Sequence, residues 1–87
     1  MKILVTGGTG FIGSNTCVEL IRNGHEVLIV DNLYNSKIEV LDKIALITGV
    51  RPLFYEIDIL DKEKLESVFQ ENKIDAVIHF AGYKAVG

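Results

Sequence analysis

The sequence predicts an α/β fold in which a doubly wound parallel sheet of four strands alternates with three helices. Three observations support this prediction. Short runs rich in Val, Ile and Leu alternate with stretches of helical periodicity, glycines cluster directly after the first run, and an acidic residue ends the second run. The resulting order, βαβαβαβ, implies right-handed crossovers between parallel strands.

The four predicted strands are brief and are bounded by polar residues or glycine. They cover residues 2–7, 26–32, 52–58 and 75–82. The first, second and fourth are apolar on both faces, as strands buried between two helical layers are. In a doubly wound sheet the fourth strand has no further neighbour among these residues. We therefore expect an uncovered edge, with low stability or self-association of the chain as its consequence.

Three helices are predicted between the strands from apolar residues at helical spacing. The first ends before Gly24, a residue typical of a C-terminal cap, and the third begins after Asp61, a typical N-cap. The apolar stripes are Gly13, Cys17, Leu20 and Ile21; Ile38, Leu41, Ile44 and Ala45; and Leu65, Val68 and Phe69.

Size, charge and cysteine content exclude several classes of protein. The 87 residues form at most one small domain, and their hydrophobic fraction of 48% is high for a chain that stands alone. A net charge of −3 without a basic cluster argues against nucleic acid as a partner. No apolar run approaches the roughly 20 residues of a membrane span. Cys17 is the single cysteine, which excludes an internal disulfide and a zinc cage and favours the cytoplasm.

A glycine-rich stretch, VTGGTGFIG, lies between the first predicted strand and the first predicted helix. Gly7 permits a tight turn, Gly10 lets the backbone approach a phosphate, and Gly13 lets the helix pack closely on the strand. A pyrophosphate group would then meet the free amides at the helix N-terminus. On the motif alone, a purely structural turn from strand to helix remains an alternative.

Two carboxylates end neighbouring strands. Asp31 follows Gly10 by about 20 residues, where an acidic side chain accepts hydrogen bonds from adenosine ribose hydroxyls and repels a 2′-phosphate, so NAD is favoured over NADP. The alternative is that Asp31 begins an Asx turn with Asn32. Asp58 could hold the adenine amino group while Ile59 packs on the ring; the alternative makes them a loop residue and a core residue.

Four stretches, VTGGTGFIGS, DNLYNS, DI at residues 58–59 and HFAGYKAVG, carry a family resemblance. Together they resemble the N-terminal part of the extended short-chain dehydrogenases/reductases, and within that group the UDP-glucose 4-epimerase family. The resemblance covers all 87 residues. It implies the N-terminal part of a Rossmann-type NAD-binding domain, incomplete at residue 87 and without its substrate domain.

The resemblance also implies a set of cofactor-binding residues. The expected roles run along the cofactor from pyrophosphate to nicotinamide, and for Lys84 an ordinary surface lysine remains an alternative. The residues are Gly7, Gly10, Phe11, Ile12 and Gly13 for the pyrophosphate; Asp31, Asn32, Asn35 and Ser36 for the adenosine ribose and its phosphate; Asp58 and Ile59 for the adenine; and Phe80, Ala81, Gly82 and Lys84 toward the nicotinamide.

The activity implied by the resemblance is the interconversion of UDP-glucose and UDP-galactose through a transient 4-keto sugar, in galactose metabolism. The family uses a Tyr-x-x-x-Lys pair for proton transfer, and this sequence lacks such a pair. We therefore assign no catalytic and no metal-binding residue, and we expect the 87 residues alone to be inactive. The full-length protein is expected to bind a UDP-sugar and to form a homodimer.

Two other functions remain open at this point. The chain could act by itself as a non-catalytic nucleotide-binding or interaction module. It could also belong to another NAD-dependent sugar-nucleotide enzyme, a dehydratase, decarboxylase or reductase. His79, inside the fourth strand, is interpreted as structural.

Overall fold

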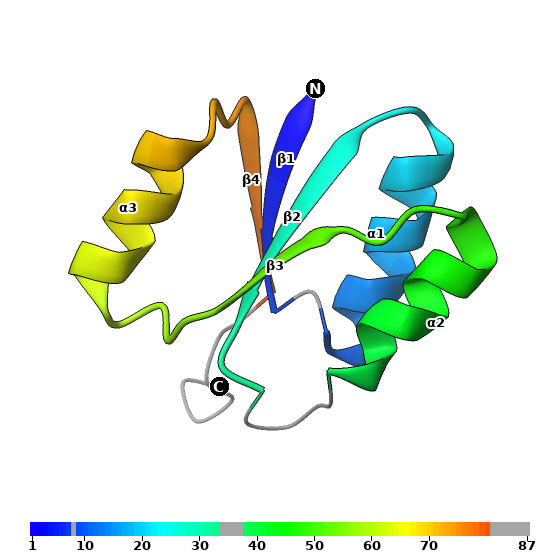
Figure 1. Ribbon diagram of the computed structural model, residues 1–87, viewed down its shortest axis with the longest axis horizontal. Coiled ribbons are helices and arrows are strands. Elements are labelled where there is room, and N and C mark those ends of the chain that lie inside the picture. Colours follow the sequence, from blue (N-terminus) through cyan, green and yellow to red (C-terminus); the bar gives the residue numbers. More distant parts are fainter. Residues whose placement is uncertain (8, 34–37, 81–87) are drawn as a thin grey trace.

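A four-stranded parallel sheet lies between two helical layers in the computed structural model of the chain, which describes residues 1–7, 9–33 and 38–80 (Figure 1). The order of the strands across the sheet is β3-β2-β1-β4. The strands are β1 (Lys2–Thr6), β2 (Glu26–Asp31), β3 (Leu53–Glu56) and β4 (Ala76–His79). The helices are α1 (Phe11–Arg22), α2 (Glu39–Thr48) and α3 (Lys62–Glu71). The predicted α/β fold and its βαβαβαβ order are confirmed.

Alternate residues of β1 and β2 point to opposite faces of the sheet, and both faces are covered. Helices α1 and α2 cover one face and α3 covers the other (Figure 1). This two-sided burial explains why the strand sequences are apolar without alternation. The first core cluster comprises Ile3, Val5, Cys17, Val18, Val27, Ile29, Leu41 and Ile44. The second core cluster comprises Leu4, Leu28, Val30 and Val68.

Strand β4 differs from the expectation of burial on both faces. It pairs with β1, from Ile3 opposite Ala76 to Thr6 opposite His79, and forms one edge of the sheet. Ala76 and Ile78 pack against the first core cluster, whereas the side chain of Val77 is 50% exposed. The predicted uncovered edge is therefore present in the part of the chain that the structure describes.

The helix ends follow the signals expected from the sequence. Gly24 has a φ of 87°, and its amide donates to the carbonyl of Ile21 while that of His25 donates to Leu20, which is the pattern of a Schellman motif. The carboxylate of Asp61 accepts a hydrogen bond from the amide of Lys64 at 3.3 Å and caps α3. Two residues of the predicted apolar stripes, Ile38 and Phe69, are exposed to solvent and not buried.

The four parallel strands place their carboxyl ends at one edge of the sheet, the lower edge in Figure 1. At this edge the amide of Gly7 donates to Val30, that of Ile57 to Asp31 and that of Phe80 to Thr6, so the described residues that follow β1, β3 and β4 lie beside neighbouring strand ends. None of the helices in the described ranges has the length and apolar character needed to cross a bilayer.

Candidate functional site

The loop after β1 makes a tight turn before α1 begins. Gly7 has a φ of 74°, a left-handed conformation that favours glycine, and its amide donates to the carbonyl of Val30 in the neighbouring strand at 2.8 Å. The amide of Gly10 donates back to the carbonyl of Gly7 at 3.1 Å. The turn assigned to Gly7 from the sequence is therefore present.

The N-terminus of α1 offers backbone amides without a side-chain cap. Gly10 is the N-cap residue, so it contributes no capping oxygen, and the first turn carries no acidic side chain. A Cβ atom built on Gly10 would lie 3.5 Å from the carbonyl oxygen of Gly7, an ordinary contact. The protein itself thus leaves room for a side chain at this position. A glycine here fits a group outside the protein that approaches the backbone closely, which is what a pyrophosphate at a helix N-terminus requires.

A groove of about 450 Å³ opens between α1 and α2 beside this N-terminus, and Gly10, Phe11 and Ser14 are part of its lining. Phe11 and Ile12 are 83% and 65% exposed, so both side chains point away from the core. Gly13 is buried on α1, as close packing of the helix on the sheet requires. The first turn of α1 is accessible to a ligand.

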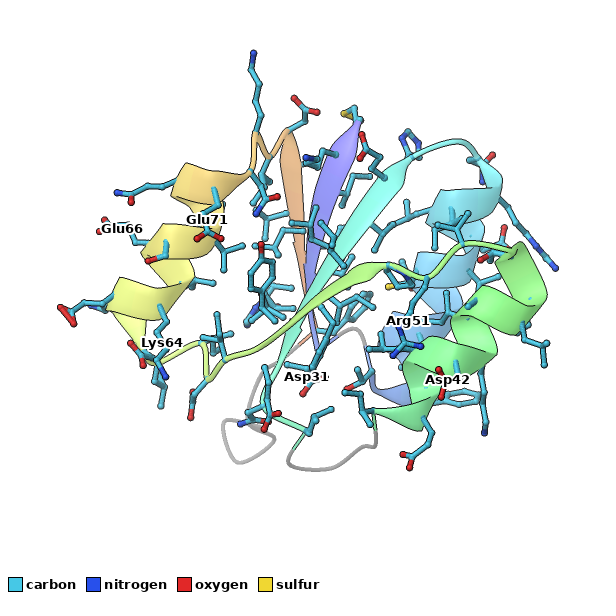
Figure 2. The ribbon with its side chains drawn as sticks, viewed as in Figure 1. Asp31, Asp42, Arg51, Lys64, Glu66 and Glu71 are labelled. Carbon is cyan, nitrogen blue, oxygen red and sulfur yellow. The ribbon has the colours of Figure 1, made fainter. Side chains whose placement is uncertain are left out.

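Asp31 is buried at the carboxyl end of β2, and its carboxylate accepts hydrogen bonds from the nearby residues Thr9 and Leu33. Oδ2 accepts hydrogen bonds from the amide of Thr9 at 3.2 Å and from the hydroxyl of Thr9. Oδ1 accepts a hydrogen bond from the amide of Leu33 at 2.9 Å, and Leu33 has a φ of 61°. Figure 2 shows Asp31 at the lower edge of the sheet, between the two helical layers.

The bond from Leu33 to Asp31 is an Asx-type turn, the structural alternative considered for this residue. The turn leaves an acceptor direction of the carboxylate open among the described residues, because an ionised carboxylate has about four such directions and three described donors reach it. Asn32 is exposed beside it. The turn and a bond to a ribose hydroxyl are therefore compatible, and the ribose role of Asp31 remains a prediction.

The residues after β3 make the contacts that their structural alternative expects. The Oδ1 atom of Asp58 accepts a hydrogen bond from the amide of Leu60 at 2.9 Å, and its carbonyl accepts one from Asp61 at 2.8 Å. Ile59 is half-buried and packs against the second core cluster. The adenine role of Asp58 and Ile59 remains a prediction.

The end of β4 is tied to the end of β1. The amide of Phe80 donates to the carbonyl of Thr6 at 2.8 Å, and the hydroxyl of Thr6 lies 2.6 Å from Nδ1 of His79. This contact agrees with a structural His79 and brings Phe80 to the same edge as the glycine loop. The other predicted site residues, Asn35, Ser36, Ala81, Gly82 and Lys84, lie outside the described residues.

Thr9 is a site residue that the sequence interpretation missed. It is 2% exposed and donates twice to Asp31. A hydroxyl residue between two loop glycines, with an acidic residue at the end of the next strand, is the sequence signal that could have identified it.

The described residues carry no reactive thiol and no metal centre. Cys17 is fully buried in the first core cluster, and burial raises the pKa of its thiol to about 12, so it stays protonated and inert at neutral pH. In the same part of the chain, no group of three or more His, Cys, Asp or Glu side chains is placed to hold a metal ion.

Comparison with known proteins gives one family. The sequence profile described as the NAD dependent epimerase/dehydratase family matches residues 3–87. The chain is 60% identical over 87 residues to the UDP-glucose 4-epimerase of Bacillus subtilis, and covers 100% of itself and 26% of that protein. It is 53% identical over 85 residues to UDP-glucose 4-epimerase uge1 of Schizosaccharomyces pombe, covering 98% of itself and 24% of that protein.

Solved structures of similar proteins agree with the fold. The UDP-glucose-4-epimerase of Stenotrophomonas maltophila, with bound NAD and formylated UDP-arabinopyranose, superposes with a TM-score of 0.94 at 52% identity. The UDP-glucose 4-epimerase of Bifidobacterium longum, in complex with NAD+ and UDP, superposes with a TM-score of 0.95 at 48% identity. Both matches cover 100% of this chain and 26% of the other. The chain therefore spans about a quarter of the length of these relatives.

Proposed function

The chain belongs to the NAD dependent epimerase/dehydratase family, and on that premise we propose that it is the NAD-binding N-terminal part of a UDP-glucose 4-epimerase. The observation that carries this proposal is the uncapped N-terminus of α1, which follows a glycine turn and is linked through Thr9 to the buried carboxylate of Asp31. Helix amides without a side-chain cap and a nearby carboxylate are the two kinds of group that the adenosine diphosphate half of NAD requires, and this supports the proposal.

In this proposal the residues of the carboxyl edge bind and orient the cofactor. The amides at the start of α1 hold the pyrophosphate, and Gly10 lets it come close to the backbone. Asp31 accepts hydrogen bonds from the adenosine ribose and repels a 2′-phosphate. Asp58 and Ile59 hold the adenine. The remaining proposed contacts are Phe11, Ile12, Gly13, Asn32, Asn35, Ser36, Phe80, Ala81, Gly82 and Lys84.

NAD supplies a hydride acceptor and donor, which allows a sugar hydroxyl to be oxidised and reduced again on the other face. The chain's own share of that reaction is binding and orientation, because its 87 residues contain no Tyr-x-x-x-Lys pair. We propose that these residues alone do not epimerise a sugar. For the whole protein we propose a UDP-sugar substrate, a homodimer and a cytoplasmic location.

Calorimetric titration of the chain with NAD and with NADP tests this proposal. We expect NAD to bind and NADP to bind at least about tenfold more weakly, a difference of about 1.4 kcal/mol. Asp31→Ala should weaken NAD binding and reduce the ratio of NAD affinity to NADP affinity. The substitution removes both the acceptor for the ribose hydroxyls and the negative charge that repels a 2′-phosphate.

Asp42→Ala is the matched control. Asp42 is an exposed carboxylate of α2 that pairs with Arg51, away from Asp31 (Figure 2). This variant should keep the NAD affinity of the parent chain and its ratio of NAD to NADP affinity. No heat with NAD, or equal affinity for NADP, would contradict the proposal.

A further inference from the structure

We propose that Thr9 is a positioning residue that orients the carboxylate of Asp31 and thereby sets the preference for NAD over NADP. This inference rests on the proposed function. The inference adds Thr9 to the proposed site as a buried residue, 2% exposed, that acts through the side chain of Asp31.

The first step is the geometry of the pair. The backbone amide of Thr9 and its hydroxyl donate to the same oxygen, Oδ2 of Asp31, while the amide of Leu33 holds Oδ1 at 2.9 Å. Two donors from one residue fix the rotation of the carboxylate more tightly than either could alone. The acceptor direction on Oδ1 that no donor among residues 1–7, 9–33 and 38–80 occupies is thereby held in one orientation.

The second step is that Thr9 itself is held in place. It lies inside the turn that the amide of Gly10 closes on the carbonyl of Gly7, and it is 2% exposed. The hydroxyl therefore has little freedom to leave Asp31. The same turn leads directly into the first turn of α1, so the proposed pyrophosphate and ribose contacts share one rigid element.

The third step concerns selectivity. A carboxylate discriminates against a 2′-phosphate only where its charge is held close to the 2′ position, since electrostatic repulsion falls with distance. A side chain that rotates freely about its Cα–Cβ bond can carry the carboxylate charge away from the 2′ position and lose this discrimination. Anchoring of Oδ2 by Thr9 prevents that rotation, so its loss should affect the ratio between the cofactors as well as the affinity.

The experiment compares NAD and NADP binding by calorimetry in the parent chain, Thr9→Val and Thr9→Ser. Valine keeps the shape of threonine and its backbone amide but removes the hydroxyl donor; serine keeps the donor. We expect Thr9→Val to bind NAD about tenfold more weakly and to lose most of its discrimination against NADP. Thr9→Ser should stay within about threefold of the parent chain both in its NAD affinity and in its ratio of NAD to NADP affinity. If circular dichroism shows that Thr9→Val does not fold, the same measurements are made on Thr9→Ala, which removes the same hydroxyl.

A double-mutant cycle separates positioning from a general structural effect. In the Asp31→Ala background, Thr9→Val should leave the NAD to NADP ratio unchanged, because the group on which Thr9 acts is gone. A parent chain that prefers NAD, with a Thr9→Val variant that keeps this preference, would overturn the inference and leave the proposed function intact. A parent chain that binds no NAD would overturn both.

Discussion

The substitution Gly10→Ala separates a glycine needed for folding from one needed for a ligand. The backbone of Gly10 has φ −75° and ψ 173°, an extended conformation that alanine adopts without strain. Among the described residues, the atom that a Cβ there would contact is the carbonyl oxygen of Gly7, at 3.5 Å. Nothing in the described structure around Gly10 therefore opposes a methyl group.

Two opposing effects on stability are of similar size. Alanine restricts the unfolded chain more than glycine does, which stabilises the fold by about 0.4–1 kcal/mol. Alanine is also a poorer N-cap than glycine, at a cost of roughly 0.5–1 kcal/mol. These contributions nearly cancel, so we expect the free energy of unfolding to change by less than about 0.5 kcal/mol. NAD affinity should fall at least tenfold, because the methyl group would occupy the space in which the pyrophosphate approaches the backbone.

The assay combines urea unfolding, monitored by circular dichroism, with calorimetric titration of the chain with NAD. Gly24→Ala is the matched control at the other end of α1. Gly24 has a φ of 87°, and no described atom lies within 4 Å of a Cβ atom built on it. The substitution should therefore reduce the free energy of unfolding through backbone strain alone, by about 1–2 kcal/mol. That variant should lose stability and keep its NAD affinity while folded. If Gly10→Ala binds NAD as the parent chain does, the pyrophosphate does not lie against Gly10 and the reasoning fails.

Two further predictions concern the core and the sheet edges. Because burial raises the pKa of the Cys17 thiol from about 9 to about 12, the unfolded chain releases this proton at a lower pH than the folded chain. The free energy of unfolding should therefore fall between pH 9 and 12, by up to about 1.4 kcal/mol per pH unit. Over this pH range the midpoint of urea unfolding should decline less steeply for Cys17→Ala than for the parent chain. Parallel curves of urea midpoint against pH for the two proteins would contradict this prediction. At the exposed β4 edge, Val77→Lys should reduce self-association in sedimentation experiments and change stability by less than about 0.5 kcal/mol. Leu53→Lys on the opposite edge, in β3, should leave association unchanged, and a parent chain that is monomeric at all concentrations would refute the prediction.

The sheet was predictable because its signals are local. Apolar runs without alternation indicated strands covered on both faces, and the caps at Gly24 and Asp61 could be identified from single residues. The half-exposed Val77 of β4 was harder, because exposure of one face depends on which elements cover it and not on the strand sequence.

The candidate site was predictable only in part, for a related reason. Glycines and acidic residues at strand ends stand out in a sequence, which is why Gly7, Gly10 and Asp31 were proposed as site residues. Thr9 did not stand out, since its role exists only once β1 and β2 lie in register and bring the loop beside Asp31. A hydrogen bond between residues 22 positions apart follows from the pairing of strands and cannot be read from either segment alone.

The position of Asp31 in the sheet also bears on how a small chain could hold a charged ligand. Strand β2 pairs with β1 on one side and β3 on the other, and the side chains of Val27 through Val30 are buried. A carboxylate at the end of such a strand has a backbone fixed on both sides, and Thr9 and Leu33 fix its oxygens. Within the residues that the structure describes, the end of β4 has a strand partner on one side only. We therefore expect the adenosine half of the proposed cofactor site to be preorganised by the described sheet, and the nicotinamide half to depend on whatever covers the β4 edge.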